Sequence, residues 1–111
     1  MKDDKLYRLH IIESIEKIEK YTDGITRADF LNSTLLQDAI LRNLQVLAES
    51  TQRLSQDFKD NNSTIEWNSI SGLRNILVHD YLGIDLDTVW NVVRSYLPEL
   101  KGVIAIPKIQ K

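Results

Sequence analysis

The stretch STLLQDAILRNLQVLAESTQRLSQDF, residues 33–58, decides the fold. Most of its large apolar residues recur at intervals of three, four or seven positions, which places them on one face of a helix. These residues are Leu36, Ile40, Leu44, Leu47, Leu54 and Phe58. Asn32 or Ser33 can cap the first turn with a side-chain oxygen. The pattern predicts one long helix from about Asn32 to Phe58, with an apolar face that other helices must cover.

A second amphipathic stretch precedes this one and predicts a helix over about residues 4–21. Its apolar stripe consists of Leu6, Leu9, Ile12, Ile15 and Ile18. Asp3 or Asp4 can cap the start, and Thr22-Asp23-Gly24 is typical of a helix end. Between the two long helices, Thr26 and Asp29 have the spacing of a capping box, which predicts a short helix.

The C-terminal half has the same helical period. The polar run of residues 59–64 predicts a loop, and a helix is expected over about residues 66–78. The apolar residues of that helix, Ile70, Leu73 and Leu77, are expected to face the core.

A break at Gly83 separates this helix from the last one, which Asp85 can cap. The apolar stripe of the last helix is Leu86, Val89, Val93 and Leu97. Pro98 is expected to kink this helix because proline has no N–H to donate, and Gly102 is expected to weaken its end. Only residues 103–106 alternate as a strand would.

These elements predict an all-α fold: an antiparallel bundle of four to five helices, forming a single domain over residues 1–111. The composition, 42% hydrophobic and 27% charged residues, is typical of soluble globular proteins. The chain contains no cysteine, which excludes disulfides and thiolate chemistry and agrees with a cytoplasmic location. The N-terminal residues are charged, and no apolar run is long enough to span a membrane, so no membrane partner is expected.

The formal net charge is −2. Proteins that bind nucleic acids over a broad surface usually carry a basic face, because phosphate neutralisation supplies much of their affinity. The composition therefore argues weakly against a broad RNA-binding surface. It remains compatible with a small site at which one or two cations contact a single phosphate.

One segment, Leu73-Arg74-Asn75-Ile76-Leu77-Val78-His79-Asp80-Tyr81, gathers chemically useful side chains beside a predicted helix end. Arg74 can bind a phosphate through its planar guanidinium. His79 can transfer protons near neutral pH, and the hydroxyl of Tyr81 can donate a hydrogen bond or accept a covalent group. Each of these residues taken alone is more often an ordinary surface or packing side chain.

Helix geometry restricts how these residues can cooperate. Five positions along a straight helix turn about 500°, which leaves Arg74 and His79 roughly 140° apart. Arg74 and Tyr81, seven positions apart, share a face if the helix continues that far. Either the helix unwinds near His79, or the site combines groups from two protomers related by a two-fold axis.

The spacing Arg74-x4-His79-x-Tyr81 resembles the motif of the HepT-like branch of the HEPN family. The flanking segments 67–74, 79–90 and 97–100 are also similar to that branch, as is the segment 42–50 in the long helix. In this last segment we expect glycine where Ala48 stands, a departure that affects only local helix packing. The resemblance extends from about Gln37 to Leu100 and is much more specific with its flanks than the motif is alone.

The resemblance implies a HEPN-like helical domain that dimerises through the motif helices. It also implies a metal-independent endoribonuclease that needs no cofactor and acts on RNA as the toxin of a type VII-like HEPN/MNT toxin–antitoxin pair. Its partner would be an MNT-type nucleotidyltransferase antitoxin that transfers AMP to the motif tyrosine. By this resemblance, Arg74 and His79 are the catalytic pair and Tyr81 is the modified residue.

Two further residues are candidates for supporting roles. Asp80 can orient an imidazole or cap a helix, and Asn43 lies close enough to the apolar stripe to support the motif helix, although an exposed edge position fits it equally well. A charge ladder formed by Arg42, Glu49 and Arg53 is expected to serve mainly as a surface or interface.

The aromatic and histidine residues outside the motif have simpler interpretations. Trp67 and Trp90 are expected to anchor the core on either side of the motif, and His10, without a second ligand at useful spacing, is expected to be solvated. The alternative function is a non-catalytic helical dimer that binds a partner nucleotidyltransferase and presents substrate to it.

Overall fold

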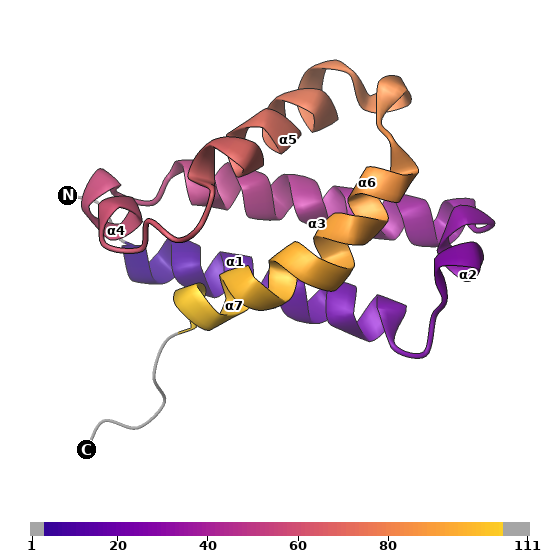
Figure 1. The fold of residues 1–111 in the computed structure, drawn as a ribbon, viewed down its shortest axis with the longest axis horizontal. Coiled ribbons are helices and arrows are strands. Elements are labelled where there is room, and N and C mark those ends of the chain that lie inside the picture. The colour runs from indigo at the N-terminus through magenta and orange to yellow at the C-terminus, as the bar shows by residue number, and fades with distance from the viewer. Residues whose placement is uncertain (1–3, 106–111) are drawn as a thin grey trace.

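The computed structural model describes residues 4–105 as a bundle of helices joined by short turns (Figure 1). Its centre is an antiparallel pair formed by α1 (Asp4–Thr22) and α3 (Thr34–Gln52), which share the most extensive contact between elements. Residues 4–105 contain no strand, so the all-α prediction is confirmed. None of the helices within this range is long and apolar enough to cross a membrane.

The other elements surround this pair. They are α2 (Arg27–Leu31), α4 (Gln56–Asp60), α5 (Trp67–His79), η1 (Tyr81–Gly83), α6 (Leu86–Asn91), η2 (Val92–Tyr96) and α7 (Leu97–Ile104). Helix α5 packs on α3, whereas α6, η2 and α7 run on from one another and contact α2 and α1 (Figure 1). The two sides of the central pair are therefore covered by different parts of the chain.

The core is built from the predicted apolar stripes. Fully or nearly fully buried side chains come from every long helix, and include Ile11, Ile15, Ile18, Ile40, Leu44, Leu47, Val89, Leu97 and Leu100. Phe30 on α2 stacks on Trp90 with ring centroids 5.3 Å apart, which closes one end of the bundle. Trp90 is thus the core anchor that its sequence position predicted.

The prediction of one helix reaching Phe58 is wrong, because α3 ends at Gln52 and a separate α4 begins at Gln56. Ser55 makes the break: its backbone N–H and hydroxyl both donate to the Asp4 carboxylate, at 2.8 and 2.7 Å. Its Oγ also accepts a bond from the Phe58 N–H as the cap of α4. Leu54 is still buried, so the spacing of the apolar residues is the same on both sides of the break. That spacing therefore gives no sign that the helix ends here.

The predicted N-terminal caps are mostly confirmed. Ser33 caps α3, and Thr26 and Asp29 form a reciprocal capping box on α2. Asp85 accepts a hydrogen bond from the Asp87 N–H at the start of α6. Asp4 lies inside the first turn of α1, and the alternative cap, Asp3, lies outside the described residues.

The strand-like pattern near the C-terminus is misleading, because Val103 and Ile104 belong to α7, which continues through Gly102. Ile104 is fully buried against the core. The Arg8 guanidinium donates to the carbonyls of Ile104 and Ala105, at 3.0 and 2.8 Å, and so caps the last turn of α7. Burial of Ile104 and the cap from Arg8 stabilise a helix at residues whose apolar alternation is typical of a strand. Ile106, the last residue of that pattern, lies outside the described residues.

The deformation expected at Pro98 occurs in the turn before it, where η2 is a π-helical segment. Proline has no N–H for the carbonyl four residues earlier, so the regular α-helical ladder cannot continue through this point. Within η2, the Tyr96 hydroxyl donates to the Glu66 carbonyl at 3.2 Å, which ties the segment to the start of α5.

This hydrogen bond predicts a loss of stability in alkali. Burial first, and then the neighbouring carboxylates of Glu99 and Glu66, raise the pKa of Tyr96 from 10.0 to about 12. The neutral phenol therefore contributes its full stability below pH 10, and that contribution disappears as the pH rises through 12. Tyr96→Phe should lower the free energy of unfolding by about 1 kcal/mol at pH 8. It should also make the decrease in that free energy above pH 10 smaller than in the wild type.

Urea unfolding at pH values from 8 to about 12 measures both effects, with Tyr7→Phe as the control for removing a tyrosine hydroxyl. An unchanged alkaline slope in Tyr96→Phe would contradict the assignment.

Candidate active site

Helix α5 carries the motif and is held on the bundle by one apolar side. Ile70 and Leu77 are buried and Leu73 is half-buried, as their spacing predicted. The helix ends at His79, and Asp80 departs from helical geometry with φ −145° and ψ 49°. The motif therefore lies at the end of a helix whose other face is open to solvent.

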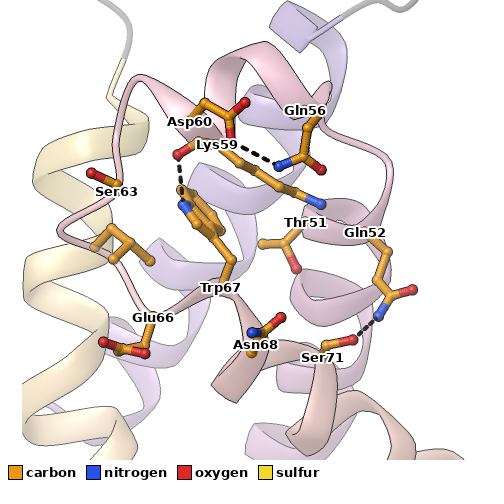
Figure 2. A pocket seen from close by; sticks show the side chains of 11 residues that line it. Thr51, Gln52, Gln56, Lys59, Asp60, Ser63, Glu66, Trp67, Asn68 and Ser71 are labelled. Carbon is orange, nitrogen blue, oxygen red and sulfur yellow. Dashed lines mark hydrogen bonds between the residues drawn. The ribbon is translucent and has the colours of Figure 1, made fainter.

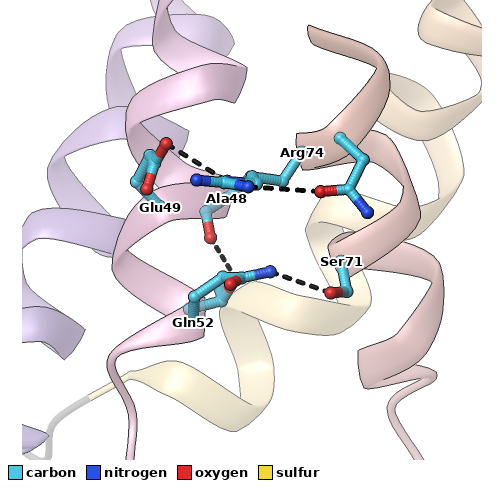
Figure 3. A network of polar contacts seen from close by, with 7 residues as sticks. Ala48, Glu49, Gln52, Ser71 and Arg74 are labelled. Atoms are coloured by element: carbon cyan, nitrogen blue, oxygen red, sulfur yellow. Dashed lines mark hydrogen bonds and ion pairs between the residues drawn. The ribbon is translucent and has the colours of Figure 1, made fainter. Parts of the chain in front are cut away.

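Arg74 turns toward α3. Its Nε donates to Glu49 Oε2 at 3.2 Å, and its Nη1 donates to Asn75 Oδ1 at 3.2 Å (Figure 3). A neighbouring contact joins the same two helices, because Gln52 Nε2 donates to Ser71 Oγ at 2.8 Å. The Arg74 side chain is 29% exposed, so the guanidinium is held in place but still accessible to a phosphate.

His79 is the last residue of α5 and is exposed. No residue of the described chain hydrogen-bonds its imidazole. Because α5 is helical from Arg74 through His79, the two side chains keep the angular separation of roughly 140° expected for a regular helix. Within one protomer the structure does not bring the predicted catalytic pair together.

Tyr81 does not share a face with Arg74, because the helix stops before it. It lies in the 3₁₀ turn η1, and its hydroxyl donates to Asp38 Oδ1 at 3.5 Å. Burial first, and then the charge of Asp38 and this hydrogen bond, raise the pKa of Tyr81. The phenol is thus held neutral on the surface of α3, at the opposite end of α5 from Trp67.

The acidic partners of Arg74 and Tyr81 share one face of α3. Asp38 and Glu49 are eleven positions apart, which corresponds to a rotation of only about 20° beyond three turns and a separation of roughly 16 Å. The sequence predicts a surface or interface charge at Glu49 and does not single out Asp38 or Asn75. The common face of Asp38 and Glu49 on α3 follows from their spacing, but the sequence does not show which helix packs beside that face.

The supporting candidates lie in different places. The Asp80 carboxylate lies over Gly83, where a Cβ would come within 2.7 Å of its oxygens. Asn43 donates from its amide to the Ala39 carbonyl of its own helix and lines a groove between α1 and α3 together with Arg42. Asn43 is therefore placed on the α1 side of α3, away from Arg74.

His10 lies on α1 and lines the same groove as Asn43 and Arg42. Within residues 4–105, no group of three or more histidines and carboxylates has the geometry to hold a metal ion. The motif itself carries a guanidinium, an imidazole and a phenol, which are groups that can bind a phosphate and transfer protons.

Comparison with known proteins identifies the family of this chain. The family described as "Ribonuclease HepT-like" matches residues 11–105. A probable ribonuclease HepT from Thermococcus cleftensis is 36% identical over 98 residues, covering 88% of this chain and 89% of that protein. The chain belongs to the HepT-like ribonuclease family.

Two relatives from Methanocaldococcus jannaschii support the same family. One, named "Putative RNase", is 30% identical over 95% of this chain and 96% of its own length. The other, named "Gamma-glutamylcyclotransferase and putative RNase", is 41% identical over 93% of this chain, which spans only 46% of that longer protein. No solved structure shows significant similarity to the chain.

The Glu49–Arg74 pair should orient the guanidinium without stabilising the fold. Both side chains are partly exposed, and pairs of this kind usually contribute less than about 1 kcal/mol. Glu49→Gln should therefore change the free energy of unfolding by under about 1 kcal/mol, as measured in urea. Glu19→Gln, which disrupts the exposed Glu19–Lys101 pair, is the matched control. A loss above about 2 kcal/mol for Glu49→Gln alone would instead make the pair a structural anchor.

Proposed function

We propose that this protein is a metal-independent endoribonuclease, the toxin of a type VII-like HEPN/MNT toxin–antitoxin system, acting in the cytoplasm as a single HEPN-like domain. The observation that carries the proposal is the motif Arg74-x4-His79-x-Tyr81 at the accessible end of α5, in a chain of the HepT-like ribonuclease family. Relatives named as ribonucleases support RNA as the substrate.

The motif supplies the groups that such a reaction needs. RNA can be cleaved when its own 2′-hydroxyl attacks the adjacent phosphorus, which requires a base, an acid and stabilisation of charge on the phosphoryl oxygens. The His79 imidazole can take or give the proton, and Arg74 can bind the phosphate. No step in this sequence depends on a metal ion or a cofactor.

A homodimer through the motif helices would complete the site. Arg74 and His79 point to different sides of α5 in one protomer, so a catalytic pair is better formed between the Arg74 of one protomer and the His79 of the other. Apolar side chains near the motif are exposed and available for such an interface: Ile76 at 42%, Val78 at 39% and Leu82 at 98%. Two protomers would form two such composite sites, each with one Arg74 and one His79.

Substitution of either residue should abolish cleavage without unfolding the chain. Arg74→Ala and His79→Ala remove a half-buried and an exposed side chain, so circular dichroism should be unchanged. Each variant alone should lose RNA cleavage in EDTA, where the wild type stays active. An equimolar mixture should regain about a quarter of wild-type activity, because half of the dimers are mixed and each mixed dimer holds one intact composite site out of two.

Three outcomes would count against parts of this scheme. Full cleavage by a folded His79→Ala chain would exclude the catalytic role of His79. Loss of wild-type activity in EDTA, with recovery on adding magnesium or manganese, would exclude the metal-independent mechanism. A mixture as inactive as its two components would place Arg74 and His79 of the same protomer in one site.

Tyr81 is proposed as the regulatory residue. Its phenolic oxygen would attack the α-phosphorus of ATP on a partner nucleotidyltransferase, forming a phosphodiester while pyrophosphate leaves and the phenolic proton passes to a base. Each AMP adds a negative charge and an adenosine two positions from His79, where both would obstruct an incoming RNA phosphate. The α3 residues that contact Arg74 and Tyr81 are roughly 16 Å apart. The AMP on Tyr81 should therefore block RNA near His79 and not at Arg74.

Co-expression with an MNT-type nucleotidyltransferase should therefore yield a chain that carries AMP on Tyr81 and remains inactive after the partner is removed. Intact-mass and peptide mass spectrometry measure the modification, and Tyr81→Phe should stay toxic and unmodified. Tyr7→Phe serves as the matched control and should be modified like the wild type. A neutralised chain without AMP, or AMP on another residue, would refute the switch.

The alternative function is a non-catalytic helical dimer that binds a partner nucleotidyltransferase and presents substrate to it. The net charge of −2 and the engagement of Arg74 by Glu49 favour this function, because both weaken attraction for RNA. A growth arrest that persists in His79→Ala would support this alternative, whereas arrest that requires His79 supports the ribonuclease.

A further inference from the structure

A polar pocket of about 390 Å³ lies beside the candidate active site and takes no part in the mechanism above. Its wall is formed by the last turn of α3, by α4 and the turns after it, and by the first turns of α5 (Figure 2). The volume is in the lower part of the range found for small-ligand sites, which suits a group the size of one nucleoside.

The pocket has lining residues close to the Arg74–Glu49 ion pair, although neither member of the pair lines it. Gln52 and Ser71, which hydrogen-bond to each other at 2.8 Å, line its edge. Ser71 is three positions before Arg74 on α5, and Gln52 is three positions after Glu49 on α3, so the pocket edge is about one helical turn from the ion pair. Figure 3 shows both contacts side by side between the two helices.

The lining suits an aromatic ring that carries hydrogen-bonding groups. Trp67 contributes a large aromatic surface whose position is set by two bonds, from Nε1 to the carbonyls of Lys59 and Asn62, both 3.1 Å long. Amide side chains supply donors and acceptors: Gln52 and Gln56 each use their amide nitrogen on a neighbour, which leaves their amide oxygens to accept. The Asn68 amide has no hydrogen-bond partner within the described chain.

The charges indicate which part of a nucleotide would enter. Two carboxylates, Asp60 and Glu66, line the pocket together with one cation, Lys59. A phosphate would be repelled by this pair of carboxylates, whereas an uncharged base would not. Aromatic surface and amide groups are also the usual means by which proteins bind unstacked bases of single-stranded RNA.

We propose that this pocket binds one nucleobase of a single-stranded RNA whose neighbouring phosphate lies at Arg74, with Trp67 stacking on the base and Asn68 reading its edge. The inference rests on the proposed function for the identity of the polymer. It adds a specificity-determining site to that function. Because a base must leave its stack to enter, the site would select loops and single-stranded ends.

The test uses four labelled hexanucleotides, each of a single base, with 2′-O-methyl sugars that block cleavage. Fluorescence anisotropy measures their affinities for the full chain. The wild type should prefer one base, and Asn68→Ala should weaken binding of that oligonucleotide on the order of tenfold while changing the other three little. Asn32→Ala, an exposed asparagine at the far end of the bundle, is the matched control and should match the wild type.

A second measurement reports stacking directly. Binding of the preferred, unlabelled oligonucleotide should quench tryptophan fluorescence in the wild type and not in Trp67→Phe, where Trp90 remains buried as a reference. Equal affinity of the wild type for all four bases, equal losses for all four in Asn68→Ala, or unchanged quenching in Trp67→Phe would each overturn the inference.

The two proposals fail separately. If the wild type cleaves RNA but Asn68→Ala binds all four oligonucleotides as the wild type does, the base pocket is wrong and the ribonuclease stands. If no RNA is cleaved while base-dependent binding and Trp67 quenching occur, the pocket stands as a single-stranded RNA site and the catalytic proposal fails.

Discussion

The rest of the structure depends on the antiparallel packing of α1 against α3. Ile11, Ile15 and Ile18 on one helix and Ile40, Leu44 and Leu47 on the other are at most 1% exposed. Each such side chain contributes roughly 1.5–3 kcal/mol to stability on burial. Together these six side chains contribute more to stability than any polar contact at the surface. It also leaves one edge of α3 open, and α5 packs along that edge.

This edge of α3 organises the candidate site. Glu49 orients Arg74, Gln52 contacts Ser71, and Asp38 receives the hydroxyl of Tyr81. Arg74 and Tyr81 are therefore positioned by α3, which lies some thirty residues earlier in the chain, as well as by their own segment. The exception is His79, which has no such support in one protomer and faces solvent at the end of α5.

An accessible histidine and a tethered arginine on different sides of one helix fit the proposed dimer, in which each protomer completes the site of the other. The proposed base pocket fits the same arrangement, because it lies on the side of Arg74 that faces α3 and leaves the His79 side for the second protomer. In this scheme one strand of RNA would contact the pocket and Arg74 of one chain, and the His79 of its partner.

Local features were readable from the sequence, because periodicity, capping residues and glycine breaks act within a few positions. These features predicted the bounds of α1 and α5 to within about one residue. They also predicted the caps Thr26 and Asp85 and gave Ser33 as one of two candidates for the cap of α3. The Arg-x4-His-x-Tyr spacing, together with its flanking segments, likewise predicted the family, which the family match confirms. Distant contacts overrode the local pattern at two places. Asp4 bonds to Ser55, where the expected long helix breaks, and Arg8 caps the end of α7 at Ile104, where the sequence alternates as a strand would.

Only the tertiary structure decided which side chains meet across the bundle. The partners of Arg74 and Tyr81 are 25 and 43 positions away. The pocket beside Arg74 forms because the chain between Thr51 and Ser71 folds back through α4, which brings the end of α3 next to the start of α5. Such juxtapositions depend on how whole helices rotate and cross to bury their apolar faces. That choice is made by the packing of many side chains together, so no local pattern around residues 74–81 could have revealed it.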